Sequence, residues 1–155
     1  MKLFKIEKSN EKIIVYILGI KFTKNLKNKN KQTKYENNAC CIGIDIEELK
    51  NKNIIFPHPT GIVIGSKVKL GNNIKIWQNV TIGAKSDIDW QNQKYPEIGD
   101  NVLIYANSVI IGDVKIGSNS IIGAMSLVTC DVEANSIYAG IPAKKIGINK
   151  IKNKI

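Results

Sequence analysis

Arginine is absent from this sequence of 155 residues, and its basic residues are 23 lysines set against 13 acidic residues. The formal net charge is +10. Arginine makes most of the bidentate contacts to phosphate groups and base edges, so its absence disfavours nucleic acid as a partner, and we predict none. The abundance of lysine, asparagine and isoleucine fits AT-rich coding and a solvated surface. The excess positive charge would also attract a polyanionic small ligand.

Histidine and cysteine are scarce. His58 is the only histidine, and the three cysteines are Cys40, Cys41 and Cys130. An odd number of cysteines that includes an adjacent pair predicts no disulfide framework, and no spacing typical of metal ligands is present. The sequence therefore predicts no metal site.

Long apolar runs are also missing. The stretch from Ile13 to Ile20 is far too short to span a bilayer, and no signal-peptide pattern follows Met1. We expect a cytoplasmic location, and contact with a membrane is not indicated.

Apolar residues instead recur every six positions, in two blocks. Because side chains alternate between the two faces of a strand, each repeated residue and the residue two before it face the same side. Three short strands of this kind form a triangular coil of about eighteen residues, and stacked coils share a narrow apolar core. The pattern predicts an all-β chain folded as a hexapeptide-type parallel β-helix. The repeated residues are Ile64, Leu70, Ile76, Ile82, Ile98, Ile104, Ile110, Ile116, Ile122 and Val128.

Small residues stand at several inward positions of this repeat, namely Ser108, Ser120 and Ser126. An inward corner of a narrow coil is cramped, so a serine fits where a leucine would overpack the interior. We therefore predict that these serines are buried.

The chain divides into three predicted regions. Residues 1–38 are predicted to form an N-terminal β-hairpin, with strands at 3–6 and 12–22, followed by a polar linker. Residues 39–146 form the β-helix domain, and 147–155 form a basic, frayed tail.

The repeat fails in two places. Residues 85–96 interrupt it and are predicted to be a loop extruded from a corner, where functional residues are common. Lys52 stands where the repeat requires an apolar residue. Residues 45–50 before it are predicted to form a helical turn or an irregular first coil.

His58 is the main candidate for chemistry, and it lies between Pro57 and Pro59. Extending the repeat backwards from Ile64 places His58 at an inward position, which predicts a core histidine. The flanking prolines prevent regular strand pairing and would hold the imidazole rigidly, which suits a general base. The local sequence leaves both interpretations open.

Three segments resemble known enzymes. Residues 58–65 (HPTGIVIG) and 78–83 (QNVTIG) resemble the catalytic block of serine acetyltransferases and of related acetyltransferases of bacterial surface-polysaccharide synthesis. Residues 138–143 (YAGIPA) resemble the closing segment of the same hexapeptide acyltransferase superfamily. The resemblance covers roughly residues 43–146. It implies a left-handed β-helix, acetyl-CoA as co-substrate, and His58 as the base that deprotonates an acceptor hydroxyl.

The resemblance also implies a carboxylate that orients His58, and Asp45 is the candidate. An alignment without gaps places Gly43 at that position, so the assignment to Asp45 requires two fewer residues in the first coil. Glu47 and Glu48 are the fallbacks. A helix-capping role for Asp45 is the alternative.

The resemblance further implies a binding site for acetyl-CoA. Backbone N–H groups near Gly83 and Ala84 would stabilise the tetrahedral intermediate. Small residues would let the pantetheine arm approach the backbone, and two lysines would either reach the nucleotide phosphates or be ordinary surface charge. The remaining residues of this predicted site are Ala106, Ala124, Ala139, Gly140, Pro142, Lys144 and Lys145.

The predicted acceptor site departs from the serine acetyltransferase pattern. Tyr95 stands where those enzymes have a second histidine, and Pro57 where they have an aspartate. Lys94 and Trp77 complete the predicted acceptor contacts. Aromatic faces such as those of Trp77 and Tyr105 often pack on sugar rings. These departures favour a glycan acceptor over free serine.

The expected function is therefore acetyl-CoA-dependent O-acetylation of a sugar, nucleotide-sugar or glycan in cell-surface polysaccharide synthesis. Residues 17–22 resemble short leader segments of surface-glycan enzymes, which points the same way. The alternatives are a serine O-acetyltransferase, an amino-sugar N-acetyltransferase, and a non-catalytic oligomerising solenoid. The γ-type carbonic anhydrases share the fold but need three histidines. By the resemblance we expect a homotrimer with active sites at subunit interfaces.

Overall fold

The computed structural model describes residues 4–8, 12–17, 20–25 and 40–150. In the N-terminal region, β1 (Phe4–Lys8), β2 (Lys12–Ile17) and β3 (Ile20–Asn25) form an antiparallel sheet in the order β1-β2-β3. The predicted hairpin is present as β1 and β2, but the predicted second strand at 12–22 is divided into β2 and β3, which adds a third strand. Strand β2 ends at Ile17 and the chain reverses, so that Ile17 pairs with Ile20. Most of the predicted linker lies outside the described residues.

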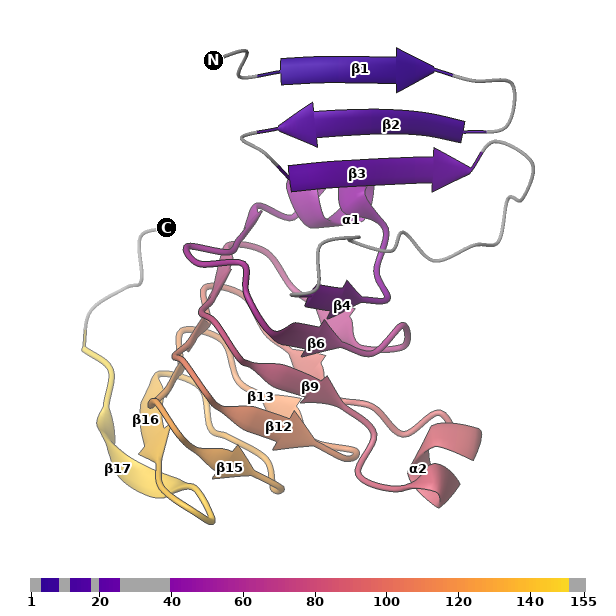
Figure 1. Ribbon diagram of the computed structural model, residues 1–155. Helices are drawn as coiled ribbons and strands as arrows, with labels where there is room; N and C mark the ends of the chain where they lie inside the picture. The colour runs from indigo at the N-terminus through magenta and orange to yellow at the C-terminus, as the bar shows by residue number, and fades with distance from the viewer. Residues whose placement is uncertain (1–3, 9–11, 18–19, 26–39, 151–155) are drawn as a thin grey trace.

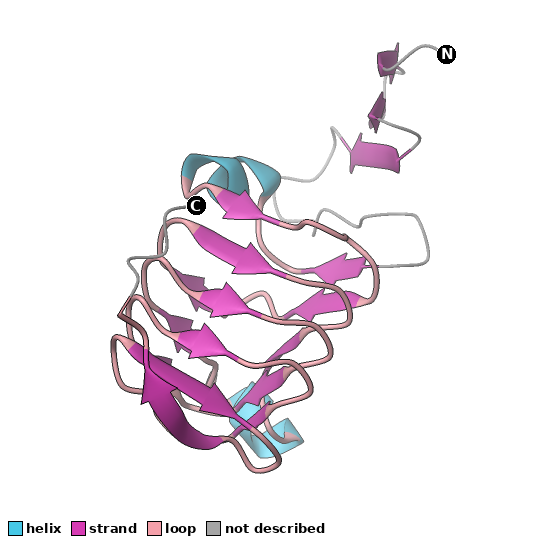
Figure 2. Cartoon of the chain, turned by 90° about the vertical axis from the view of Figure 1, so that its left-hand side faces the viewer, coloured by secondary structure: helices cyan, strands magenta, loops and turns pink. Residues whose placement is uncertain are grey.

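From residue 40 onward the chain winds as a parallel β-helix of three sheets (Figures 1 and 2). The first sheet contains β4 (Cys40–Ile42), β6 (Ile62–Ile64), β9 (Thr81–Gly83), β12 (Val109–Ile111) and β15 (Leu127–Val128). The second sheet contains β5 (Ile54–Ile55), β8 (Ile74–Ile76), β11 (Leu103–Ile104), β14 (Ile121–Ile122), β16 (Ser136–Ala139) and β17 (Lys144–Ile148). The third contains β7 (Lys69–Leu70), β10 (Glu97–Ile98) and β13 (Lys115–Ile116).

The strand register confirms the predicted coil. Ile64 pairs with Ile82, eighteen residues later, and Ile104 pairs with Ile122 at the same spacing. The extruded loop adds ten residues to one coil, so Ile76 pairs with Ile104. All ten repeated apolar residues are buried and belong to one continuous core.

The inward serines are buried, as predicted. Ser108, Ser120 and Ser126 are at most 1% exposed. Each hydroxyl donates to the carbonyl oxygen three residues earlier, with distances of 2.6 to 2.7 Å. The small side chain thus fits the narrow interior and also satisfies its own polar atom.

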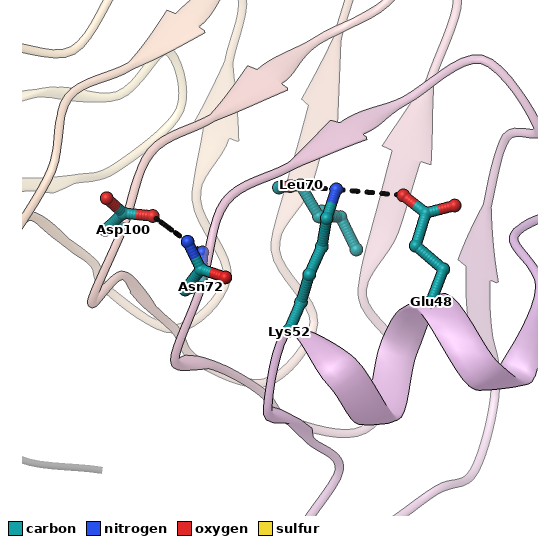
Figure 3. Close-up of polar contacts among 5 residues, drawn as sticks. All are labelled: Glu48, Lys52, Leu70, Asn72 and Asp100. Atoms are coloured by element: carbon teal, nitrogen blue, oxygen red, sulfur yellow. Dashed lines mark hydrogen bonds and ion pairs between the residues drawn. The ribbon is translucent and has the colours of Figure 1, made fainter.

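The first coil contains the predicted helical turn, α1 (Ile46–Asn51), which buries Leu49. Lys52 follows it and does not enter the core. Its Nζ donates to Glu48 Oε1 at 2.9 Å and to the Leu70 carbonyl oxygen at 2.8 Å (Figure 3). Lys52, which stands where the repeat requires an apolar residue, therefore links α1 to the next coil.

Asparagines form a ladder along the corner between the third and second sheets. Asn53, Asn73, Asn101 and Asn119 all have φ between 53° and 60°. The Nδ2 atoms of Asn53, Asn73 and Asn101 each donate to Oδ1 of the next asparagine, at 3.0 to 3.2 Å. Asparagine tolerates this left-handed conformation better than other non-glycine residues. The asparagine content thus has a structural use that composition alone did not indicate.

A neighbouring contact fastens the same corner. The backbone N–H of Asn72 donates to Asp100 Oδ1 at 2.7 Å, and its side-chain Nδ2 donates to the same oxygen at 3.0 Å (Figure 3). The Asp100 N–H in turn donates to Ser118 Oγ. Three successive coils are thereby tied at this edge.

The C-terminal end differs from the predicted frayed tail. Strand β17 runs antiparallel to β16 and covers its free edge (Figure 1). Asn149 is 8% exposed, its N–H donates to Asn135 O at 2.9 Å, and its Nδ2 donates to Asn119 O at 2.8 Å. Residues 147–149 therefore belong to the folded domain.

The extruded loop carries a short helix, α2 (Asp87–Gln91), which begins after Ser86 and projects from the side of the coils (Figure 1). No helix in the described part of the chain is long and apolar enough to cross a membrane.

Candidate active site

His58 lies on the edge of the β-helix where the chain passes from the second sheet to the first. We call this corner the histidine edge. In successive coils it comprises residues 56–61, 77–80, 105–108 and 123–126, and the turn between β16 and β17 at residues 140–143 continues it. Backbone bonds tie its coils together. Asn79 N–H donates to Thr60 O at 2.8 Å, and Asn107 N–H donates to Gln78 O at 3.0 Å.

The first corner of this edge is longer than the corner below it. Ile54 pairs with Ile74, twenty residues later, whereas Val63 pairs with Thr81, eighteen residues later. Residues 56–61 therefore hold two more residues than the corner they stack on. These extra residues move His58 out of the inward phase, and His58 is exposed. The inward position extrapolated from the repeat is wrong, and the core-histidine interpretation fails with it.

The backbone around His58 is closely constrained. Thr60 N–H donates to the His58 carbonyl oxygen at 2.8 Å, which closes a tight turn about Pro59. Gly61 has φ +65°, and a Cβ there would lie 2.2 Å from Asn79 Oδ1. Only glycine fits both the conformation and the space. The two prolines and this glycine present His58 to solvent in a fixed frame.

Asp45 lies at a different corner, which we call the loop edge. It comprises residues 43–45, 65–68, 84–96, 111–114 and 129–132, where the chain leaves the first sheet. The Asp45 carboxylate caps α1 by accepting the Glu47 N–H at 2.8 Å. In the described residues no hydrogen bond or ion pair joins it to His58. The capping alternative is thus what the structure shows.

The two fallback carboxylates are also engaged elsewhere. Glu47 pairs with Lys50 at 3.1 Å, and Glu48 pairs with Lys52 at 2.9 Å. Neither contacts His58. Within the described part of one chain, His58 therefore has no orienting carboxylate.

Most of the predicted coenzyme contacts lie along the same edge as His58, in the coils that follow it. The histidine edge contains Ala106, Ala124, Gly140 and Pro142, and Ala139 directly precedes it. Ala124, Gly140 and Pro142 are exposed, and Ala106 and Ala139 are partly exposed. Small residues in successive coils leave the backbone accessible along this edge.

Apolar side chains line the same edge. Met125 is 65% exposed and Ile141 is 71% exposed. Trp77, which is partly buried, stacks on Tyr105 with ring centroids 4.5 Å apart and an interplanar angle of 22°. Exposed apolar groups that follow one edge are typical of a binding surface.

The predicted oxyanion donors lie at the loop edge instead. Gly83 is the last residue of β9, and its carbonyl oxygen accepts the Gly112 N–H at 3.0 Å. Among the described residues the Ala84 N–H donates to no oxygen, and Ala84 is partly exposed. The strands of the first sheet separate this edge from the histidine edge by about 10 Å, the length of three strand residues.

The two predicted acceptor residues at the loop edge, Lys94 and Tyr95, differ in how exposed they are. Lys94 is exposed. Tyr95 is 8% exposed, and a Cβ added to Gly65 would lie 2.6 Å from its Cε1. The Tyr95 ring therefore packs over Gly65 where the extruded loop returns to the core. Within one chain this position anchors the loop, and the role of Tyr95 as a substrate contact stays a prediction.

The two lysines after the Pro142 turn lie on β17 and are exposed. Lys145 Nζ pairs with Glu133 Oε2 at 2.5 Å, and this hydrogen bond raises the pKa of Lys145. Lys144 belongs to no ion pair among the described residues. In the described part of the chain, no cluster of three or more histidine, cysteine or acidic residues could hold a metal ion.

Comparison with known proteins gives the class of the fold. Residues 95–130 match the family described as bacterial transferase hexapeptide (six repeats). The repeat and the stacked parallel sheets give the chain the fold of hexapeptide-repeat transferases, the predicted left-handed β-helix.

The relatives are more specific. The chain is 41% identical over 91 residues to serine acetyltransferase of Staphylococcus aureus, covering 59% of this chain and 42% of the relative. It is similar to soybean serine acetyltransferase complexed with serine (TM-score 0.58, 37% identity, 70% of this chain and 40% of the other). It is also similar to a serine acetyltransferase in complex with CoA (TM-score 0.55, 31% identity, 70% of this chain and 40% of the other).

These findings confirm the resemblance drawn from the sequence motifs. The chain contains hexapeptide transferase repeats at residues 95–130 and is serine acetyltransferase-like over the part that these relatives match. It spans about two fifths of the length of these relatives.

Proposed function

We propose that this protein is an acetyl-CoA-dependent O-acetyltransferase whose acceptor is L-serine. The observation that carries the proposal is the exposed His58, held in a fixed frame at the head of an edge lined by small, accessible residues. The relatives support the choice of substrates, since they are serine acetyltransferases and include complexes with serine and with CoA.

The glycan acceptor expected from the sequence has less support. The relatives are serine acetyltransferases, so the alternative reaction fits them better than polysaccharide O-acetylation does. The argument against serine from Tyr95 is also weaker, because within one chain Tyr95 packs in the core. Pro57 remains a departure at the exposed corner.

In the proposed reaction His58 removes the proton from the serine hydroxyl, and the oxygen attacks the thioester carbonyl of acetyl-CoA. The tetrahedral intermediate collapses with release of the CoA thiolate, which takes the proton back from His58. A backbone donor such as the Ala84 N–H would stabilise the oxyanion. No covalent enzyme intermediate is required.

His58 and Ala84 lie on different edges of one chain, so a site that uses both needs two copies. We propose a homotrimer in which the histidine edge of each copy faces the loop edge of the next. An interface between two different surfaces closes into a ring when the rotation permits it. Light scattering should then give three times the mass of one chain.

Mixed oligomers test the shared site directly. His58→Ala removes the base, and Ala84→Pro removes the N–H donor. Each variant should be nearly inactive alone. After the two are unfolded and refolded together, activity should return in part, because some interfaces combine an intact His58 with an intact Ala84. A mixture that stays inactive, with both variants folded and oligomeric, would place both groups in one copy or exclude one of them.

The reaction is tested by thiol release from acetyl-CoA. We expect turnover with L-serine and none with a panel of sugars, amino sugars and nucleotide sugars, and His58→Asn should abolish it. Turnover on a sugar alone would restore the glycan interpretation. Absence of any thermal shift with CoA would favour a non-catalytic solenoid.

A further inference from the structure

Gln78 contains an unusual polar atom on the histidine edge. The residue is partly exposed, yet its Oε1 is buried and accepts no hydrogen bond. It is the only buried side-chain nitrogen or oxygen without a partner in the described residues. A buried unpaired carbonyl lowers the stability of the folded state, and such atoms in native proteins call for an explanation.

The position of Gln78 ties it to the candidate site. Thr60, Gln78, Ala106 and Ala124 form one column, because each directly precedes a residue with positive φ. Backbone bonds stack the column: Asn79 N–H donates to Thr60 O, and the next two coils repeat the contact at 3.0 and 2.9 Å. Gln78 therefore lies one coil below the His58 corner, at the head of the two alanines.

Within this column Gln78 alone has a long side chain that ends in an acceptor. The alanines below it offer only backbone atoms, and Thr60 above it is short. Asn79, the next residue, is held in place because its Nδ2 donates to Asn107 Oδ1 at 3.1 Å. A substrate placed between His58 and Ala106 would thus meet the flexible Gln78 side chain, whose buried carbonyl oxygen has no partner.

We propose that the side-chain carbonyl of Gln78 turns outward when substrate binds and accepts a hydrogen bond from a substrate N–H. This inference rests on the proposed function. A carbonyl oxygen only accepts, so the substrate must bring the donor. Two N–H groups qualify, the amides of the pantetheine arm and the ammonium of serine, since the serine hydroxyl donates to His58. Rotation of the side chain also brings the buried, unpaired Oε1 into contact with a donor, so the conformational change requires little free energy.

Gln78→Met tests the assignment, because methionine keeps the length of the side chain and removes the oxygen. The free protein should melt about 2 °C or more higher, since the unpaired carbonyl is gone. The KM should rise roughly 2- to 10-fold for one substrate, with kcat almost unchanged. A rise for acetyl-CoA identifies the pantetheine amide, and a rise for serine identifies the ammonium. Lys115→Met, on the third sheet, is the matched control.

A second measurement, NMR of the glutamine side chains, tests the proposal even if the Gln78→Met variant does not fold. The chain has four glutamines, so ¹⁵N-glutamine labelling gives four side-chain NH₂ signals, and loss of one in a Gln78 variant assigns it. That signal should shift on saturation with CoA or with L-serine. A signal that stays in place with both, or unchanged KM values in Gln78→Met, overturns the proposal. These readouts of binding stand apart from turnover, so a protein that binds CoA but transfers nothing to serine would refute the proposed function alone.

Discussion

Asp45 offers the sharpest test of how the site is built, because its two possible roles predict opposite results for one substitution. As the N-cap of α1, its carboxylate accepts the Glu47 N–H at 2.8 Å. As an orienter of His58, its charge would stabilise the imidazolium formed during the reaction. Asparagine keeps the capping acceptor and removes the charge, whereas alanine removes both.

The capping role sets the size of the expected effects. Asparagine caps helices about as well as aspartate, so Asp45→Asn should leave the free energy of unfolding nearly unchanged. Asp45→Ala should lower it by about 1 kcal/mol. For a chain of this size that corresponds to a melting temperature roughly 2–4 °C lower. Leu49, which α1 buries, transmits the loss to the core.

The assay combines thermal unfolding with the rate of thiol release from acetyl-CoA. We expect both variants to keep a kcat within about twofold of the wild type, because within one chain no hydrogen bond or ion pair joins Asp45 to His58 and its carboxylate is held by the Glu47 N–H. Glu47→Gln, which removes a neighbouring charge but not the cap, is the control. If Asp45→Asn melts normally but loses tenfold or more in kcat, Asp45 acts on His58 and the reasoning from the cap is refuted.

Four further predictions follow from the same structure. His58→Ala should keep the melting temperature and lower kcat by about 10²- to 10⁴-fold, and retained activity would exclude His58 as the base. Gly61→Ala should destabilise the fold by more than about 1 kcal/mol in urea titration, whereas Gly83→Ala, where a Cβ meets nothing within 4 Å, should be nearly neutral. Asn73→Ala should cost roughly 1–2 kcal/mol by the same titration, since it removes two ladder bonds and places alanine at φ 55°. The ion pair with Lys69 lowers the pKa of Glu97, so its stabilisation is present above the ordinary carboxylate pKa and is lost as the pH falls through the lowered value. Wild type and Glu97→Gln should therefore differ in melting temperature at neutral pH and low salt and converge in acid.

Much of the fold could be predicted because the repeat is a local signal. Six-residue spacing of branched residues identified the buried positions, and the serines at cramped corners were recognised by size alone. The break at 85–96 marked the extruded loop for the same reason, because an interrupted period is visible without knowledge of the partner strands.

The predictions failed where the outcome depended on pairing between distant residues. The N-terminal hairpin has a third strand that was not predicted, because the chain reverses again after Ile17. The tail forms β17 because β16 offers it a free edge. Neither strand pairing can be predicted from the spacing of apolar residues in the strands that pair.

The candidate site shows the same division. The sequence by itself determined the coil, the lone imidazole and the small residues of successive corners, since each depends on residue type and spacing. Only the tertiary structure decided that His58 faces solvent, that Asp45 caps a helix and that Tyr95 anchors the loop. The exposure of His58 depends on how many residues its corner holds relative to the coil stacked against it, and the other two outcomes depend on contacts with neighbouring elements. A difference of two residues at such a corner turns a side chain from the core to the surface.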